Sequence, residues 1–222
     1  MDRRAGMFEL TGGKMVINDL IKRYPALEGT RNDFESAFNL LKECFSSGSK
    51  LLVAGNGGSM ADSQHIVGEL MKRFSIKRSL SNQLIQELLV YGDDGRYLAE
   101  MLEGALPAIA LDAAPLTSAV VNDSGCGDTA FAQMINGLGK PGDVFWAITT
   151  SGNSRNVYLA AITARALGMK VLALTGMSGG IIKGIADVSI CVPETETYKV
   201  QELHLPIYHA LCLMLENEFF GT

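Results

Sequence analysis

The sequence predicts an α/β protein built on a doubly wound, parallel, five-stranded sheet flanked by helices. Five short apolar runs occur along the chain, and segments with helical spacing of apolar residues separate them. Glycine-rich turns join the runs to the helices, as in right-handed βαβ units. Because the 222 residues contain no low-complexity segment and no linker, we expect a single domain over residues 1–222.

Extra helices are predicted before the sheet. Apolar residues recur at helical spacing from Val16 to Phe45, and Pro25 and Gly29 divide this stretch into two helices. Residues 1–15 carry charge but lack the apolar stretch of a secretory signal, so they are interpreted as a flexible lead-in.

Five strands and a long helical insertion follow. The predicted strands are Leu51–Ala54, Ala108–Leu111, Asp143–Ile148, Lys170–Leu174 and Val188–Val192. Between the first two, residues 79–104 have a helical pattern interrupted by YGDDG. We expect this block to pack at a subunit interface or over the mouth of the site. A last helix is predicted from Thr197 to Phe220.

Composition argues against several classes of partner. The net charge of −5 disfavours a nucleic-acid-binding surface. The basic run of Lys72, Arg73, Lys77 and Arg78 is interpreted as a solvated face after a helix. No apolar stretch reaches the ~18 residues of a membrane span, so no membrane partner is expected. Four cysteines without a CxxC pair favour a reducing, cytoplasmic location.

Two loops rich in glycine and hydroxyl groups follow the first and third predicted strands, where ligands bind in parallel sheets. In GNGGS, Gly57 and Gly58 let the backbone approach an anion, while Asn56 and Ser59 offer side-chain hydrogen bonds. In TTSGNS the hydroxyl groups are those of Thr149, Thr150, Ser151 and Ser154. Together the loops predict a phosphate site; the alternative is two tight turns with serine caps. Neither loop is a Walker or GxGxxG motif, and a third, TGMSGG, is interpreted as a turn.

The three histidines are candidates for acid–base or metal chemistry. His65 and Glu69 are four residues apart on a predicted helix, which puts both on one face and suits zinc; the alternative is a surface pair. Gln201 and His209 are eight apart, offset by about 80° and ~12 Å on a straight helix. Pro206 lies between them, and we hypothesise that a kink there helps them converge. His204 is interpreted as a structural or supporting residue.

Two acidic residues complete the candidate set. Asp123 follows Asn122 in VVNDSGCGD, which we place at a strand end as a substrate contact, the alternative being an Asx turn. Asp62 is interpreted as a first-turn charge that complements a helix dipole.

The segments GNGGSMADSQHIVGEL, TTSGNS and VQELHLPIYH resemble the sugar isomerase (SIS) family and, within it, the phosphoheptose isomerases. The resemblance runs from about Val16 to Phe220. It implies an aldose–ketose isomerase that converts sedoheptulose 7-phosphate to D-glycero-D-manno-heptose 7-phosphate through an enediol. It also implies a homotetramer with active sites at subunit interfaces and a zinc ion in many members. Two departures are the long block over residues 79–104 and ETETYK before VQELH, where an acidic residue and Arg are expected.

The resemblance also implies roles for individual residues. Substrate contacts would be Asn56, Gly57, Gly58, Glu69, Asn122, Asp123, Thr149, Thr150, Ser151, Ser154 and Gln201. Metal ligands would be His65, Glu69, Gln201 and His209. Isomerisation needs one acid and one base, for which Glu69 and His209 fit, with their individual roles left open. The alternatives are a non-catalytic SIS module that binds a partner protein or senses a phosphosugar, and an isomerase for another phosphosugar.

Overall fold

The computed structural model describes residues 15–221, so nearly all of the predicted lead-in, residues 1–15, lies outside the described residues. Five strands form one parallel sheet in the order β2-β1-β3-β4-β5. Their bounds are β1 Leu51–Ala54, β2 Ala108–Ala110, β3 Val144–Thr149, β4 Lys170–Thr175 and β5 Val188–Cys191. The five predicted strands are confirmed, with ends that differ by at most one residue.

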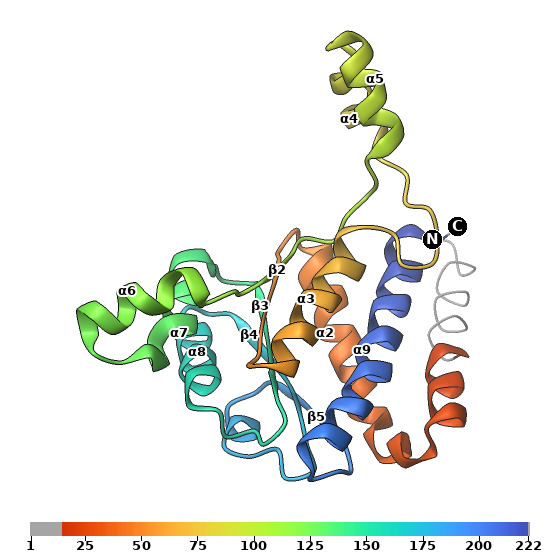
Figure 1. Ribbon diagram of the computed structural model, residues 1–222. Coiled ribbons are helices and arrows are strands. Elements are labelled where there is room, and N and C mark those ends of the chain that lie inside the picture. Colours follow the sequence, from red (N-terminus) through yellow and green to blue (C-terminus); the bar gives the residue numbers. More distant parts are fainter. Residues whose placement is uncertain (1–14, 222) are drawn as a thin grey trace.

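Helices surround the sheet on both faces (Figure 1). A helix over residues 15–23 and the short η1 precede the first long helix. The bounds are η1 Pro25–Thr30, α2 Arg31–Ser46, α3 Gly58–Met71, α4 Asn82–Leu89, α5 Gly92–Met101, α6 Ala114–Ser124, η2 Gly127–Thr129, α7 Ala130–Leu138, α8 Arg155–Ala166, η3 Ile182–Gly184 and α9 Thr197–Phe220. No helix in residues 15–221 has the length and apolarity needed to cross a membrane.

The sheet is buried on both faces, which explains why its strands are apolar runs without alternation. Val53 and Trp146 pack into the cluster that faces α2, α3 and α9. Their neighbours in the strands, Leu52 and Phe145, point to the opposite face and pack against α7 and α8. Successive side chains thus supply two separate cores, one on each face of the sheet.

The strand order creates a crevice between β1 and β3. From β1 the chain crosses to β2 on one side, then returns to β3 on the other side of β1. In open α/β sheets, ligands bind at the carboxyl ends of the strands where the order reverses in this way. GNGGS follows β1 and TTSGNS follows β3, so both loops lie at this crevice.

The predicted insertion forms a helical hairpin of α4 and α5 that projects away from the rest of the molecule (Figure 1). Neither helix covers the mouth of a site in its own chain, so that part of the expectation is wrong within one subunit. The hairpin leaves many large apolar side chains exposed. They are Leu84, Leu89, Val90, Tyr91, Tyr97, Leu98, Met101 and Leu102.

The basic run between α3 and the hairpin differs from expectation at one residue. Lys72, Arg73 and Lys77 are exposed, but Arg78 is buried, with 1% of its surface accessible. Its guanidinium donates to Glu216 Oε1 on α9 at 2.9 Å. Interpreting Arg78 as part of a solvated face was therefore wrong, because a partner 138 residues away compensates its charge.

Candidate active site

The two predicted phosphate loops meet through a pair of asparagines. Asn56, in the loop after β1, and Asn156, in the first turn of α8, exchange two side-chain hydrogen bonds of 2.9 Å. Each amide donates to the carbonyl oxygen of the other, which holds the two loops side by side across the crevice. The prediction that both loops lie together is borne out by this contact.

The loop after β3 is ordered by its own hydroxyl groups. Thr149 Oγ1 and Ser154 Oγ are 2.9 Å apart, and Ser151 Oγ accepts from the backbone N–H of Asn153. Ser154 precedes α8, but its side chain does not cap the helix. Gly57 precedes α3 and has no side chain to cap it. Neither N-cap side chain therefore occupies the first backbone N–H groups of its helix, which suits an anion. In α8 only the Val157 N–H already donates to a side chain, at Asn156 Oδ1.

The loop after β4, TGMSGG, supports the TTSGNS loop. Asn153 Oδ1 accepts from the N–H of Ile181 at 3.0 Å, and Ile182 donates its N–H to the Gly152 carbonyl at 3.1 Å. Gly152 has φ of +69°, and a Cβ placed on it would lie 2.1 Å from the Gly179 carbonyl oxygen. The third loop is thus more than a turn, because its backbone packs directly on the second loop.

This close approach predicts a large effect of Gly152→Ala. Its methyl group would collide with the Gly179 backbone, and its positive φ is strained for alanine, so the loop must shift. We expect a loss of at least about 1 kcal/mol in the free energy of unfolding. We also expect a raised KM for a phosphorylated substrate, measured by urea unfolding and steady-state kinetics. Gly137→Ala, in α7 where a Cβ meets nothing within 4 Å, is the control; equal behaviour of the two variants would contradict this account.

Helices α3 and α9 run parallel and side by side (Figure 1). Gly58 contacts Gln201, and farther along both helices His65 contacts Tyr208; both pairs are 143 residues apart, so the two helices advance in the same direction. We call the line of contact between these two helices the α3–α9 seam. It starts at Gly58 and Gln201 beside the GNGGS loop, and it continues past His65 to Glu69.

The seam corrects the expectation that a kink brings Gln201 and His209 to one point. The Gln201 amide lies against Gly58, where an added Cβ would come 2.4 Å from Nε2. His209 instead lies two turns farther along, with its ring centroid 4.9 Å from that of His65. Helix α9 is continuous through Pro206. The eight-residue spacing on α9 is therefore matched by a similar advance along α3.

His65 stands between the two candidate catalytic residues. Its Nε2 is 3.1 Å from Glu69 Oε1, and its ring contacts His209 edge to face. Burial lowers the pKa of His209, and the charges of His65 and Arg23 lower it further, whereas Glu69 opposes them. His209 is therefore neutral near pH 7, and its buried Nε2 has no hydrogen-bond partner in residues 15–221. Glu69, His65 and His209 are close enough to meet one small molecule.

A second chain of contacts reaches His65 from the other side. The Tyr208 hydroxyl lies 3.0 Å from His65 Nδ1 and donates to Asp62 Oδ1 at 3.3 Å. Burial raises the pKa of Asp62, which the hydrogen bond from Tyr208 opposes. Burial and the Asp62 charge raise the pKa of Tyr208. Asp62 is thus more than a helix-dipole charge, because it is paired with a buried hydroxyl.

The donors near His65 suit zinc by their chemistry, since two imidazoles and a carboxylate are ligands that zinc prefers. Within residues 15–221, however, no three His, Cys, Asp or Glu side chains are arranged as a ready-made metal site. His65 Nε2 and Glu69 Oε1 lie 3.1 Å apart and face each other, and the two atoms have to separate before both can bind an ion. The Nε2 of His209 is buried without a hydrogen-bond partner in residues 15–221, which makes it a candidate for a further ligand.

His204 is structural. Its side chain is fully buried, and neither ring nitrogen has a hydrogen-bond partner among the described residues. Burial lowers the pKa of His204 to about 4, and the Thr175 carbonyl, which lies near the ring but outside hydrogen-bond geometry, partly offsets this effect. The imidazole is therefore neutral in the folded protein and lies away from the α3–α9 seam, toward β4.

This buried imidazole makes stability depend on pH. In the unfolded chain His204 takes up a proton near pH 6.5, whereas in the folded protein it does so only near pH 4. The unfolded state is favoured as pH falls between these values, so stability present above pH 6.5 is lost toward pH 4, by about 3 kcal/mol. We expect His204→Leu to reduce this slope in urea unfolding at several pH values. If the unfolding free energy of the variant falls with pH as steeply as that of wild type, groups other than His204 cause the pH dependence.

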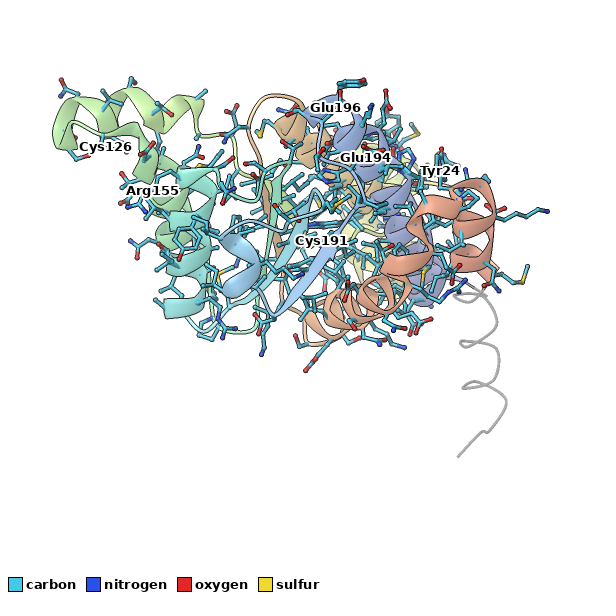
Figure 2. The ribbon with its side chains drawn as sticks, turned by 90° about the horizontal axis from the view of Figure 1, so that it is seen from below. Tyr24, Cys126, Arg155, Cys191, Glu194 and Glu196 are labelled. Carbon is cyan, nitrogen blue, oxygen red and sulfur yellow. The ribbon has the colours of Figure 1, made fainter. Side chains whose placement is uncertain are left out.

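Asn122 and Asp123 are not at a strand end. They occupy the last turn of α6, are exposed, and hydrogen-bond to each other at 3.0 Å. The expectation that they follow a strand was wrong because VVNDS continues a helix that begins at Ala114. Figure 2, which looks onto the carboxyl ends of the strands, shows Cys126, just beyond α6, far from Glu194 and Glu196 near the start of α9. Within one chain, α6 packs mainly on α7 and η2 rather than on the seam.

Three contacting residues were not singled out from the sequence. Asn156 lies within the quoted AITTSGNSRN, but only its pairing with Asn56 gives it a role. Asn153 was hidden in the same motif. Tyr208 directly precedes His209. It could have been identified only by knowing that α3 and α9 lie side by side in parallel, which places Tyr208 beside His65.

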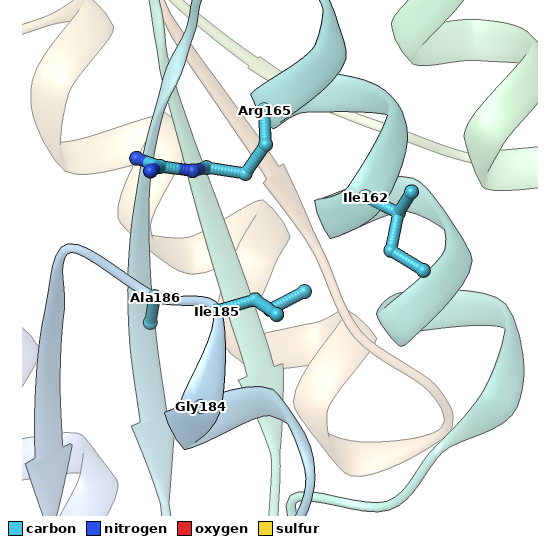
Figure 3. Close-up of a pocket in the computed structure, with 5 residues that line it drawn as sticks. All are labelled: Ile162, Arg165, Gly184, Ile185 and Ala186. Atoms are coloured by element: carbon cyan, nitrogen blue, oxygen red, sulfur yellow. The ribbon is translucent and has the colours of Figure 1, made fainter.

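A surface hollow lies elsewhere on the molecule (Figure 3). Its lining residues are Ile162, Arg165, Gly184, Ile185 and Ala186. Arg165 is bound to Asp187 at 2.6 Å, and the lining holds no acid–base pair. The hollow lies beside the C-terminal half of α8, away from the loops that flank the helix N-terminus, and is not part of the candidate active site.

Comparisons with known proteins identify relatives of this chain. A SIS domain family model matches residues 96–176. The chain is 35% identical to the phosphoheptose isomerase of Akkermansia muciniphila over 198 residues, covering 89% of this chain and 92% of that protein. It is 42% identical to the phosphoheptose isomerase of Geotalea daltonii over 184 residues, covering 82% of each.

Solved structures show the same fold. The phosphoheptose isomerase of Francisella tularensis superposes with a TM-score of 0.70 at 29% identity, covering 98% of this chain and 100% of that one. The phosphoheptose isomerase of Neisseria gonorrhoeae gives 0.67 at 29% identity, covering 97% of both chains. Shared motifs, sheet order and near-complete coverage lead to one conclusion: the chain belongs to the phosphoheptose isomerase family of SIS-domain proteins.

Proposed function

We propose that the protein is a phosphosugar aldose–ketose isomerase that converts sedoheptulose 7-phosphate to D-glycero-D-manno-heptose 7-phosphate through an enediol. One observation carries this proposal. Glu69 and His209, from distant parts of the chain, both border the His65 ring on adjacent parallel helices. The relatives named phosphoheptose isomerase support the choice of substrate.

The loops at the crevice supply the phosphate site of this proposal. The N-termini of α3 and α8 offer backbone N–H groups and the positive ends of two helix dipoles. Hydroxyl groups of Thr150, Ser151 and Ser154 add donors for the phosphate oxygens. The Asn56–Asn156 pair keeps the two helix starts together, so that both can act on one anion.

Proton transfer is assigned to Glu69 and His209. Isomerisation removes a proton from one carbon and returns one to its neighbour, while a proton moves between the two oxygens. Neutral His209 can accept a proton through its unpartnered Nε2. The Glu69 carboxyl can exchange a proton with the substrate from the other side of His65. Either residue can be the base, and the other is then the acid.

A zinc ion belongs to the same proposal, held by His65, Glu69 and His209. Gln201, which lies two turns away against Gly58, does not join them in this arrangement. When bound, zinc would polarise the carbonyl and hydroxyl oxygens of the sugar. The proposal is supported by the adjacency of two imidazoles and a carboxylate and by the unpartnered Nε2 of His209. Elemental analysis of the purified protein after incubation with zinc and desalting tests it. Retention well below one ion per chain would contradict it.

The decisive experiment is conversion of sedoheptulose 7-phosphate by the purified protein, followed by chromatography of the heptose phosphates. We expect turnover that a chelator reduces and added zinc restores. A panel of other ketose phosphates separates this substrate from related ones. Failure to convert any member of the panel would favour the non-catalytic SIS module, for which the seam residues have no use.

We further propose that the protein forms a homotetramer with sites shared between subunits. Two features support self-association. The hairpin of α4 and α5 exposes a series of large apolar side chains, more than an isolated monomer normally leaves in water. Asn122 and Asp123 lie far from the seam of their own chain, and a neighbouring subunit offers a second seam that they can approach.

Light scattering after size-exclusion chromatography tests this assembly. Replacing Leu89, Val90 and Tyr91 at the hairpin tip with serine is expected to give smaller particles, whereas a wild-type monomer would contradict the proposal. We place the enzyme in the cytoplasm, which is supported by four free cysteines, a pattern typical of reducing compartments.

A further inference from the structure

Tyr208 makes an unusual contact for a core residue. It is 1% exposed, yet its hydroxyl group lies between an imidazole and a carboxylate. The two contacts come from successive turns of α3, Asp62 and His65. The hydroxyl therefore joins α9 to both turns, at the centre of the α3–α9 seam.

One hydroxyl proton cannot serve both neighbours. The Asp62 carboxylate accepts hydrogen bonds and cannot donate them. Tyr208 is its sole side-chain donor in residues 15–221, and its other oxygen, Oδ2, is buried without a partner. Withdrawing the tyrosine proton would leave a partly buried charge without any hydrogen bond. The proton is therefore committed to Asp62.

The direction of the Tyr208 proton also determines the direction of the hydrogen bond between Tyr208 and His65. With its proton directed to Asp62, the Tyr208 oxygen presents electron pairs to His65, so Nδ1 must supply the proton of the 3.0 Å hydrogen bond. A neutral imidazole has one N–H, so Nε2 then presents an electron pair to Glu69, and the 3.1 Å contact between them holds no proton. The Glu69 carboxylate has another partner, Lys72 Nζ at 3.7 Å. Among the described residues Asp62 has only Tyr208, so the proton is needed more at Asp62. The nitrogen left free is the one beside the candidate catalytic carboxyl.

We propose that Tyr208 is a positioning residue that, together with Asp62, fixes the His65 ring with its proton on Nδ1 and its electron pair on Nε2. A free electron pair at Nε2 is what either a metal ligand or a proton acceptor requires. Partners of this kind tune a neighbouring imidazole without touching the substrate. The consequence for turnover rests on the proposed isomerase function, whereas the proton position on His65 does not.

Nitrogen-15 NMR of the three histidines tests the proposal without any substrate. Protonated and bare ring nitrogens resonate in separate ranges, and the His65 signals are assigned by their loss in His65→Gln. In metal-free wild-type protein, at a pH where imidazoles are neutral, we expect Nδ1 protonated and Nε2 bare. In Tyr208→Phe we expect the proton to shift toward Nε2, because Glu69 then offers the remaining acceptor.

The control is Tyr198→Phe, an exposed tyrosine on the same helix, which should leave the His65 signals unchanged. If Tyr208→Phe does not fold, Asp62→Ala replaces it, and the same loss of preference for Nδ1 is expected. A wild-type His65 protonated on Nε2 would overturn the proposal. So would a folded Tyr208→Phe or Asp62→Ala variant with an unchanged proton position.

Kinetics supply the second readout. For Tyr208→Phe we expect kcat to fall about 10–100-fold, as for other residues that orient a functional imidazole, with little change in KM. If wild-type protein shows no turnover but His65 carries its proton on Nδ1, the isomerase function fails while the positioning role stands. If turnover is present and Tyr208→Phe retains full kcat, Tyr208 does not position a group that matters for the reaction.

Discussion

Glu69→Gln is expected to abolish most turnover of sedoheptulose 7-phosphate while leaving the fold intact. Glutamine has the size of glutamate, and its amide group can donate to His65 Nε2 across the present 3.1 Å contact, so α3 should keep its packing. It cannot take up or release a proton at neutral pH. Loss of a general acid or base costs typically ~10²–10⁴-fold in rate. Steady-state kinetics and thermal melting monitored by circular dichroism measure the two effects.

A control variant and a measurement of zinc content make this experiment specific to the Glu69 carboxyl. Glu35→Gln, on the exposed face of α2, removes the same charge away from the seam and should have wild-type turnover. The zinc content of Glu69→Gln shows whether lost activity follows lost metal or lost proton transfer. If the variant melts normally and turns over like wild type, the carboxyl has no catalytic role, and the non-catalytic SIS module becomes the better account.

The largest effect on stability is expected at Glu216. Its carboxylate accepts backbone N–H groups of Phe74 and Ser75 at 2.7 Å and of Ile76 at 3.1 Å, besides the Arg78 guanidinium. Burial alone would raise the pKa of Glu216, but these four donors outweigh it and lower the pKa. Glu216→Gln removes the charge and replaces one accepting oxygen with an NH₂ group, which cannot accept from the surrounding N–H donors. It leaves Arg78 buried without its counter-charge, at a cost of about 3–5 kcal/mol.

Such a loss is a large share of the stability of an ordinary domain. Urea unfolding measures it, with Glu202→Gln on an exposed position of α9 as the control, expected within about 0.5 kcal/mol of wild type. Arg78 also donates to the backbone carbonyl of Glu69 at 2.7 Å, so Glu216→Gln should lower turnover even below its melting temperature. A change under about 1 kcal/mol would show that the buried pair is not needed for stability.

The local sequence pattern was sufficient to predict features that lie within a single strand, loop or helix. The strands were predictable because they are short apolar runs between helical segments, and the three central strands are buried almost throughout. The loops could be placed together because carboxyl ends of parallel strands share one edge. His65 and Glu69 were predictable as a pair because four residues make about one helical turn, and the structure joins them at 3.1 Å.

Residues whose roles depend on a second element could not be predicted. Arg78 belongs to a basic run, and only the position of Glu216 on α9 explains its burial. Asn122 and Asp123 were placed at a strand end because VVNDS also fits a strand, whereas packing with η2 and α7 accommodates a helix there. In the sequence, Tyr208 is one of several residues on the apolar face of α9. Its contacts with His65 and Asp62 become visible only when α3 is placed beside α9.

The sequence by itself determined the α/β class, the positions of the five strands, the two loops rich in glycine and hydroxyl groups, and the family motifs. Each of these depends on a period or a turn within a few neighbouring residues. Only the tertiary structure decided that α3 and α9 run parallel with matched spacing, which places Gln201 against Gly58 and His209 against His65. The physical reason is that helix register across a packed interface depends on how side chains from distant segments fill the same space, and no local pattern encodes it.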